Sequence, residues 1–407
     1  MSQILLVTTN FWPEPTGTAI YTTDLAMTLL GHGHEITVLT SLPHYPWWRI
    51  PKEYSYLSEG ESLYEAVRVV RAKHIVPSKM NAFSRVRFEL SLWSNLLRVS
   101  RRFHNGDFNL VIATIPTVAA GIVAKSISKR LKIPLGIVVE DLSGAGAKQS
   151  GLPGGAIIAK VAEFVETFTL KSADELVIVS PAMSNVIETL GVKKSKITQI
   201  YNYSARIITQ VDKEESRKIF GWSPQDFVVI HTGNMGAKQD LENVVRAAGH
   251  LVTDNKIKIF LVGHGNQEEN LKTMCFEQRN ISVLPAVADE NYSALLAAAD
   301  LLLVNERSTQ LEMSLPSKLT SYLYSQRPVI AAVPRGGATW KFLEGTAELV
   351  DAENPQLLAE RIVQLQANPL EMERLADAGF KFAQNHLSPE SGRAHYLKWV
   401  DRILNTN

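Results

Sequence analysis

The sequence predicts an α/β protein made of two doubly wound, Rossmann-like domains. Its 407 residues exceed the length at which a single hydrophobic core keeps growing, so two domains are expected. Short apolar, β-branched runs recur in both halves, and amphipathic helical patterns separate them. Such runs are typical of parallel strands that are buried on both faces, with helices covering each side of the sheet.

The apolar runs that we expect to be strands fall into two similar series. The first series lies at residues 4–8, 35–39, 110–115, 135–139 and 176–180. The second lies at 227–232, 257–262, 281–284, 300–304 and 328–333, with helical patterns near 239–253, 266–276, 289–298 and 317–325. Because strands and helices alternate, each series predicts a parallel sheet.

A mixed, polar stretch at residues 201–226 is the predicted linker between the domains. We therefore assign residues 1–205 to the first domain and 206–387 to the second. Helical patterns follow Pro355, and the last, at about 389–404, has Tyr396, Trp399 and Val400 on one apolar side. A closing helix of this kind can cross back to the first domain, and residues 388–407 are assigned there.

Composition excludes several classes of partner. The formal net charge of +1 gives no overall attraction to nucleic acid, and none is expected as a partner. The single cysteine, Cys275, excludes an intramolecular disulfide and fits a reducing cytoplasm. The first ten residues are typical of a strand rather than a signal peptide, and no apolar stretch approaches the roughly 20 residues of a membrane span. A cytoplasmic protein, at most peripheral on the plasma membrane, is expected.

Ligands of parallel sheets bind beyond the carboxyl ends of the strands, so the loops there are the first candidates for a site. The loop after the first predicted strand contains two prolines and then Gly17, directly before a helix. Gly17 could let a phosphate approach the backbone closely. From this glycine alone, an ordinary turn into the helix is the favoured interpretation.

The matching loop of the second half is more specific. Gly233 and Gly236 space a turn after a strand, and Lys238 stands at the start of the following helix, which suits a diphosphate. The alternative is a solvated lysine beside an ordinary turn, and we favour the functional interpretation. The similar segment 263–265, with two glycines, is a weaker signal because many strand-to-helix turns use glycine.

A third loop places Pro316, Ser317 and Lys318 at the start of a helix. Ser317 could be only a helix cap, and Lys318 could be only a solvated cation. However, lysines at two helix starts of one domain predict the two sides of a phosphate clamp.

Two carboxylates, Glu140 and Asp141, end a predicted strand of the first half. Carboxylates at that position suit a base for an acceptor hydroxyl or a contact to a sugar, whereas capping or solvation is the alternative. The residues alone leave both interpretations open. The histidines do not show spacings typical of metal ligands, so a metal-independent site is expected.

In their order and spacing, these segments resemble the GT-B glycosyltransferases of glycosyltransferase family 4, over nearly the whole chain. Within the family they are most similar to the bacterial branch with the colanic acid fucosyltransferase and the O-antigen N-acetylfucosamine transferases. The segments that carry the resemblance are Pro13 to Gly17 with Tyr21, 33–38, Pro43-His44-Tyr45-Pro46, Glu140-Asp141, 233–239, and 315–319 with Tyr322.

The resemblance implies two Rossmann-like domains that face each other across a cleft. It also implies a nucleotide-diphosphate sugar held mainly by the second domain, and an acceptor held mainly by the first. Transfer would retain the anomeric configuration and would need neither a metal nor another cofactor. The acceptor would be a glycan or a polyprenyl-diphosphate-linked oligosaccharide of bacterial surface polysaccharide, such as O-antigen or exopolysaccharide.

The resemblance also implies roles for particular residues. Asp141 and Lys238 would be the catalytic pair, with Lys238 on the donor diphosphate and Asp141 near the sugar. The acceptor side would include Glu140, His44 and Tyr45. The donor side would include Gly17, Gly233, Asn234, Lys238, Pro316, Ser317, Lys318 and Ser321.

Two of these positions depart from the family pattern. Asn234 stands where many members carry an arginine, and Ser321 stands where many carry a glutamate that contacts ribose. Recognition of ribose is therefore the part of the site that the resemblance does not carry over.

The segment 68–102 is strongly basic, with nine Lys or Arg residues and one acid, Glu89. It also contains apolar residues such as Phe83, Phe88 and Trp93. A basic amphipathic helix lying on an anionic bilayer is one interpretation, and a core-packed helix with a basic solvent face is the other. The sequence does not favour either of them.

Two other functions use the same two-domain plan. A sugar-nucleotide epimerase would be expected to place more carboxylates and histidines around the sugar, and a non-catalytic binder would perform no transfer. The transferase is the predicted function.

Overall fold

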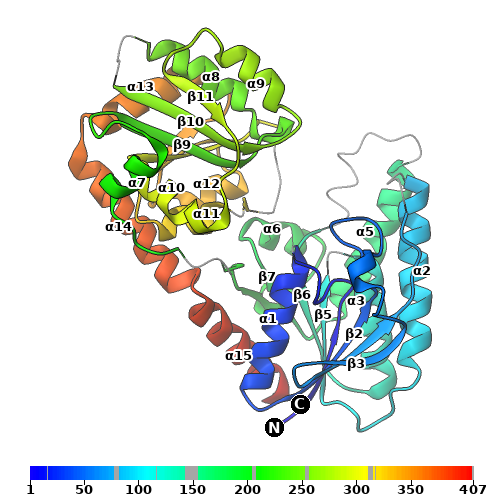
Figure 1. The fold of residues 1–407 in the computed structure, drawn as a ribbon. Helices are drawn as coiled ribbons and strands as arrows, with labels where there is room; N and C mark the ends of the chain where they lie inside the picture. The colour runs from blue at the N-terminus through cyan, green and yellow to red at the C-terminus, as the bar shows by residue number, and fades with distance from the viewer. Residues whose placement is uncertain are drawn as a thin grey trace. The chain divides into compact units, whose positions relative to one another are not determined.

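The computed structural model describes residues 1–15, 17–77, 82–115, 117–142, 155–203, 208–252, 256–309, 315–316 and 318–405, with backbone alone at 82 and 155–159. The chain divides into two compact units (Figure 1). The first unit comprises Met1–Asn202 with Gly392–Asn407, and the second comprises Tyr203–Ser391. The limits expected from the sequence, 205/206 and 387/388, lie close to these.

The first unit is built on an eight-stranded sheet with the order β3-β4-β2-β1-β5-β6-β7-β8. All neighbouring strands are parallel except β3 and β4. The order reverses between β1 and β5, and the loops beyond this point are where ligands bind in doubly wound sheets. The strands are β1 (Gln3–Val7), β2 (Glu35–Ser41), β3 (Gly60–Tyr64), β4 (Val67–Ala72), β5 (Leu110–Ile115), β6 (Leu135–Val139), β7 (Glu175–Ile178) and β8 (Ile197–Gln199).

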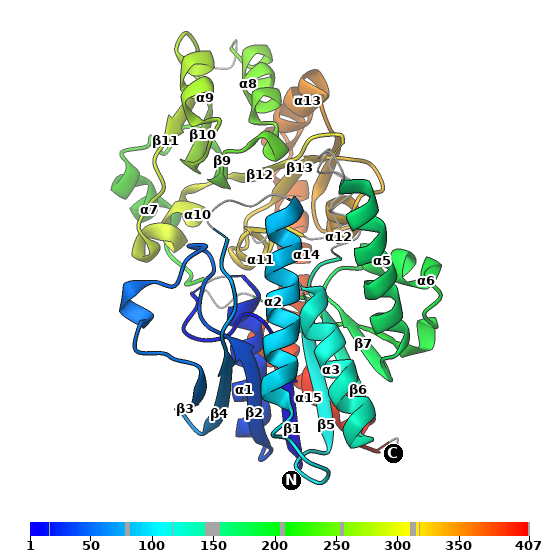
Figure 2. The same ribbon diagram turned by 90° about the vertical axis from the view of Figure 1, so that its right-hand side faces the viewer.

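Helices cover both faces of this sheet. Figure 2 shows α2 (Ala82–Ser100), α3 (Val118–Leu131) and α5 (Gly155–Lys171) over the near face. The opposite face carries α1 (Thr18–Gly31) and α15 (Pro389–Asn405), which lie side by side (Figure 1). The helix α6 (Ala182–Thr189) follows β7, and short 3-10 turns occur at η1 (Lys52–Tyr54) and η2 (Lys194–Lys196).

The C-terminal helix α15 packs on the sheet of the first unit through an aromatic residue. Trp399 is 1% exposed, and a Cβ placed on Gly136 of β6 would lie 2.7 Å from its ring. Glycine at this position therefore makes room for the indole. Arg402 adds a 3.0 Å ion pair to Glu175, and Arg393 pairs with Asp24 of α1.

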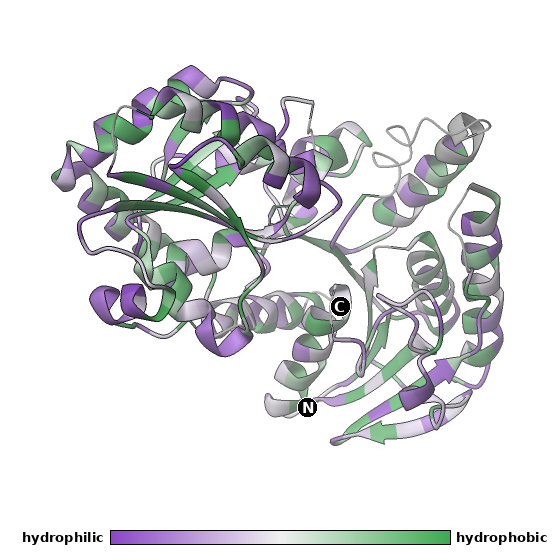
Figure 3. Cartoon of the chain, turned by 45° about the horizontal axis from the view of Figure 1, so that its top comes forward, coloured by the Kyte–Doolittle hydropathy of each residue, from purple (hydrophilic) through white to green (hydrophobic). Residues whose placement is uncertain are grey.

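The second unit has a six-stranded parallel sheet with the order β11-β10-β9-β12-β13-β14, so its order reverses between β9 and β12. Its strands are apolar and its helices are polar on their outer faces (Figure 3). The strands are β9 (Phe227–Asn234), β10 (Ile257–His264), β11 (Ile281–Leu284), β12 (Leu301–Asn305), β13 (Val329–Val333) and β14 (Glu348–Asp351). The helices are α7 (Lys213–Phe220), α8 (Leu241–His250), α9 (Glu268–Cys275), α10 (Tyr292–Ala298), α11 (Lys318–Tyr324), α12 (Ala338–Leu343), α13 (Pro355–Gln366) and α14 (Pro369–His386), with 3-10 turns η3 (Ala237–Gln239) and η4 (Asp289–Asn291).

Two predictions about local structure were wrong. The expected linker at 201–226 contains α7, which Asp212 caps by accepting from the Glu215 amide at 2.9 Å and which ends at Gly221 with φ 69°. The helix was missed because its sequence is highly charged, although one of its charged residues is buried. Arg217 is 3% exposed and pairs with Asp300.

The basic segment 68–102 is not one helix either. It begins in β4, where every residue except Arg68 is buried, and only its second part forms α2. Within the described ranges, no helix is long and apolar enough to cross a membrane.

Candidate functional site

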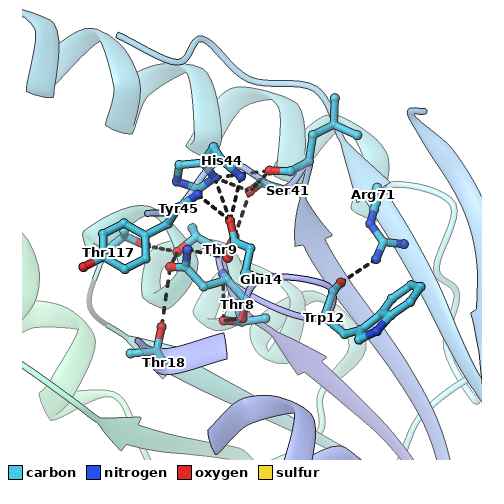
Figure 4. A network of polar contacts seen from close by, with 12 residues as sticks. Thr8, Thr9, Trp12, Glu14, Thr18, Ser41, His44, Tyr45, Arg71 and Thr117 are labelled. Atoms are coloured by element: carbon cyan, nitrogen blue, oxygen red, sulfur yellow. Dashed lines mark hydrogen bonds and ion pairs between the residues drawn. The ribbon is translucent and has the colours of Figure 1, made fainter. Parts of the chain in front are cut away.

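A buried carboxylate joins two loops beside the reversal point of the first sheet (Figure 4). Glu14 Oε1 accepts hydrogen bonds from the His44 and Tyr45 amides at 2.7 and 2.8 Å. Its Oε2 accepts from Asn10 Nδ2 at 2.8 Å. Burial raises the pKa of Glu14, and these hydrogen bonds act in the opposite direction. Glu14 therefore fixes the loop after β1 against the loop after β2.

This connection brings two predicted site residues together. Gly17 has φ 65°, and a Cβ placed on it would lie 3.0 Å from the Tyr45 ring. Only glycine fits this backbone comfortably, so the turn into α1 passes close beneath Tyr45. His44 is 2% exposed, and burial lowers its pKa to about 4, so its ring is neutral.

A second support for this loop comes from the basic segment. Arg71 is 1% exposed and donates to Ser62 Oγ and to the Trp12 carbonyl, both at 2.8 Å. Burial lowers its pKa to about 10. Arg71 thus stabilises the loop from inside the protein and contributes no surface charge.

The adjacent carboxylates at the end of β6 lie in different environments. Glu140 is 8% exposed and accepts from Asn202 Nδ2 at 2.7 Å, while its Oε1 has no hydrogen-bond partner among the described residues. Burial, with a smaller effect from Asp141, raises the pKa of Glu140 to about 7. Asp141 is exposed, and its Oδ1 accepts from the Leu142 amide at 2.8 Å. Of the two, Asp141 is the one that a ligand in solution can reach.

In the second unit, β9 continues further than the sequence suggested. Gly233 and Asn234 were expected in a loop, but they pair in parallel with Gly263 and His264 of β10. A Cβ on Gly263 would lie 1.9 Å from the Gly233 carbonyl oxygen, and one on Gly265 would lie 2.3 Å from that of Met235. The close approach of two backbones requires these glycines, which explains the motif that seemed unspecific.

A buried asparagine fixes the turn that carries Lys238. Asn305 Nδ2 donates to the Gln239 and Asp240 carbonyls at 2.8 and 2.9 Å, and its Oδ1 accepts from Asn243 Nδ2 at 2.9 Å. The Arg307 amide also donates to the Lys238 carbonyl at 3.0 Å. The backbone at Lys238 is therefore held from two sides while its side chain is exposed.

Lys318 begins α11 and reaches back over β9. Its Nζ lies 2.9 Å from His231 Nε2, and it lies 3.6 Å from the position of a Cβ on Gly233. Burial lowers the pKa of Lys318 to about 7, and the nearby Glu306 carboxylate opposes that shift. The structure thus brings the predicted residues Gly233 and Lys318 together at the reversal point of the second sheet.

The remaining predicted residues have varied positions. Asn234 is exposed and donates from Nδ2 to Gln239 Oε1 at 3.1 Å. Pro316 is half-buried, Ser321 is 6% exposed inside α11, and Ser317 lies outside the described residues.

Sequence reasoning missed Glu14, Asn305 and His231. Signals existed for two of them, since Glu14 stands between two prolines and His231 ends the apolar run of β9. Over the described ranges, no group of three or more His, Cys, Asp or Glu side chains is arranged to hold a metal ion.

A separate polar hollow of about 400 Å³ lies near the opposite, amino-terminal edge of the second sheet. Asp300 and Lys213 line it, and they are already paired with each other. Because Asp300 also pairs with Arg217 and accepts from the Val228 amide at 2.6 Å, it anchors the start of β9 and is not available to a ligand.

Comparison with known proteins agrees with this architecture. Residues 16–203 match the family described as "Glycosyl transferase 4-like domain", and 212–382 match "Glycosyl transferases group 1". The Escherichia coli K12 protein WcaI, named as a glycosyl transferase of colanic acid biosynthesis, is 28% identical over 337 residues, covering 79% of this chain and 81% of WcaI.

Solved structures show the same fold over essentially the whole chain. Sucrose-phosphate synthase from Thermosynechococcus elongatus has a TM-score of 0.74 at 14% identity, with all of both chains covered. The Anabaena protein HepE, solved in complex with UDP, has a TM-score of 0.71 at 15% identity, with 99% of this chain and 100% of HepE covered.

Two Rossmann-like domains with these matches define a glycosyltransferase of the GT-B fold. The chain belongs to glycosyltransferase family 4.

Proposed function

We propose that this chain transfers a sugar from a nucleoside-diphosphate sugar to a glycan or polyprenyl-diphosphate-linked acceptor, with retention of configuration, during assembly of a bacterial surface polysaccharide. The observation that carries this proposal is Lys318 held over Gly233 at the reversal point of the second sheet. The name of WcaI favours polysaccharide assembly, and the HepE complex favours a nucleotide donor.

Donor binding follows from the charges at this edge. The leaving group is a nucleoside diphosphate, so negative charge develops on it as the glycosidic bond breaks. Lys318 and the exposed Lys238 are cations that stabilise this charge without a metal, and Asn234 offers a neutral donor beside them. Gly17, Pro316, Ser317 and Ser321 complete the proposed donor set by family analogy.

Acceptor binding is assigned to the first unit. Asp141 is an exposed carboxylate at the end of β6 and takes the position near the transferred sugar. Tyr45 lies over Gly17 and is the proposed acceptor contact, with His44 and Glu140 behind the surface that the acceptor meets.

The test is incubation of the protein with a panel of nucleotide sugars, with and without a bacterial lipid extract. We expect sugar transfer to the extract without added metal, and a product with the anomeric configuration of the donor. Epimerised donor in the absence of acceptor would identify an epimerase, and binding without turnover would identify a non-catalytic binder. Fucose-type donors are the first to test because of the branch that the sequence resembles.

We also propose that the protein lies on the inner face of the plasma membrane. Ion pairs in the first unit limit which of its surfaces could contact the bilayer. Several cations of the segment 68–102 are neutralised by acids outside it, since Arg98 pairs with Glu59, while Arg68 and Arg102 pair with Glu61. The count of basic residues along the sequence therefore overstated the surface charge.

What remains is a set of exposed apolar side chains on two helices that cover the same face of the first sheet (Figure 2). We call it the α2/α5 surface, and it consists of exposed Phe83, Leu90 and Trp93 on α2 and Val161, Phe164 and Phe168 on α5. Arg87 and Lys73 line a shallow hollow together with Leu90. Aromatic side chains and cations together suit the interface of an anionic bilayer.

We expect the protein to sediment with vesicles of anionic phospholipid at low salt. A variant with Trp93→Ser and Phe164→Ser should lose this binding, whereas Leu63→Ser, a change of an exposed leucine on β3, should keep it. Equal binding by both variants would exclude the α2/α5 surface.

A further inference from the structure

An imidazole is buried inside the central strand of the second sheet, directly under Lys318. His231 is 0% exposed and pairs with Leu261 of β10 within the parallel ladder. Burial and the neighbouring Lys318 hold the pKa of His231 well below its ordinary value of 6.5, although backbone carbonyls oppose this. The ring is therefore neutral, with one N–H and one lone pair.

Hydrogen bonding determines which nitrogen carries the proton. His231 Nδ1 lies 3.1 Å from the Leu303 carbonyl oxygen, which can only accept, so the proton is on Nδ1. Nε2 then has a free lone pair, and it lies 2.9 Å from Lys318 Nζ, which donates. A chain of hydrogen bonds thus runs from Lys318 through His231 to the backbone of β12.

This chain limits where the amino group of Lys318 can go. A lysine side chain normally samples many rotamers, and ordering it weakens any contact that it makes with a ligand. Here the side chain already lies over Gly233, where a Cβ would stand 3.6 Å from Lys318 Nζ, in ordinary van der Waals contact. The cation is preorganised at the reversal point before a ligand arrives.

We propose that His231 is a positioning residue, whose neutral imidazole holds the amino group of Lys318 over Gly233 so that it meets the donor diphosphate. This inference rests on the proposed donor role of Lys318. His231 would then contribute to donor binding as well as to the hydrophobic core.

The experiment measures binding of UDP and GDP by calorimetry to the full chain and to five variants. His231→Leu removes the acceptor and should weaken binding of the preferred nucleotide at least tenfold, with little change for the corresponding nucleoside. His231→Gln provides an amide oxygen in place of Nε2 and should restore binding to within about threefold. Val229→Ala, a buried change in the same strand, should lower the melting temperature and leave binding unchanged.

Lys318→Ala distinguishes the donor role of Lys318 from the positioning role of His231. If it binds nucleotide as well as the original protein does, the donor role of Lys318 is wrong, and the task assigned to His231 is wrong with it. If it binds weakly while His231→Leu binds normally, the donor role stands and positioning by His231 is wrong. The two changes combined should weaken binding no more than Lys318→Ala alone, and additive losses would show that His231 acts without Lys318.

Discussion

The two sheets use the same edge in different ways. In the first unit, the loops after β1 and β2 are joined by Glu14, a buried carboxylate that accepts three hydrogen bonds from protein groups. In the second unit, the turn after β9 is held by the buried amide of Asn305, the side chain of Lys238 is exposed, and Lys318 lies over Gly233. A buried carboxylate whose oxygens accept hydrogen bonds from protein groups fixes the conformation of the loops around it. A lysine amino group that can still donate a hydrogen bond can bind a ligand.

This contrast suggests that mutations at the two edges have different effects. Changes at Glu14 should act mainly on stability, because its partners are protein groups. Changes at Lys318 should act mainly on the donor, because a buried lysine with a lowered pKa does not stabilise the fold.

The largest expected effect is that of Lys318→Ala on turnover. Loss of a preorganised cation from a developing diphosphate charge should lower kcat/KM by about 100- to 1,000-fold. The melting temperature should stay the same or rise, because a costly buried amine is removed. Steady-state kinetics and calorimetry check both parts, with Lys341→Ala on α12 as the control lysine. A large fall in melting temperature would show that Lys318 stabilises the fold, as Glu14 does, and would contradict the difference between the two sheets.

Glu14→Ala should show the reverse pattern. It leaves the amides of His44 and Tyr45 and the side chain of Asn10 without their acceptor, which should lower the free energy of unfolding by about 3 kcal/mol. Glu14→Gln keeps an acceptor oxygen and should lose about 1 kcal/mol. Denaturant unfolding measures both values, and the affinity of the folded variant for UDP or GDP should change far less than that of Lys318→Ala.

Glu140→Gln tests the buried carboxyl of the first unit. The pKa of Glu140 is raised from 4.5 to about 7, so the folded state favours the protonated carboxyl and its stabilisation is lost as the pH rises from about 4.5 through about 7. The glutamine variant should therefore be more stable than the original at pH 8, by about 3 kcal/mol, and similar to it at pH 4. Asp141→Asn removes the smaller of the two effects that raise the pKa of Glu140, so it should move this pH profile only slightly, in the direction of lower pH.

The smallest expected effect is a pH dependence of donor affinity. The pKa of Lys318 is lowered to about 7, with His231 and Glu306 as the titratable groups that face it. Lys318 is charged below this pH and neutral above it, so affinity for a nucleotide sugar should fall as the pH rises above 7, by up to about tenfold per unit. Lys318→Arg stays charged and should give a flat profile between pH 7 and 9, and a parallel fall in that variant would assign the titration to another group.

Much of the fold was predictable because the pattern of apolar residues along the sequence follows the burial of the side chains in strands and helices. The apolar runs of β1, β2, β5, β6 and β9 were identified within one or two residues, since strands buried on both faces are apolar throughout. The strands β3, β4, β8 and β14 were missed. Three of them are edge strands whose sequences alternate or are short, and β4 carries two arginines among its apolar residues.

The candidate site was predictable where the backbone dictates the residue type. Gly17 and Gly233 have positive φ values, and Lys318 follows a proline at the start of a helix, so the sequence marks them. Partners brought together by folding were not predictable. Asn305 and the turn at Gln239 are separated by 66 positions, and Lys318 and His231 by 87, so no local pattern joins them.

The last helix has a consequence for how the protein is made. The chain leaves the ribosome with its N-terminus first, and a domain normally completes its fold as soon as its own residues have emerged. Here the surface of β6 around Gly136 receives Trp399 only after the whole second unit has been synthesised. The first unit is therefore finished after the second, and a nascent chain must keep the apolar surface around Gly136 uncovered until α15 has emerged.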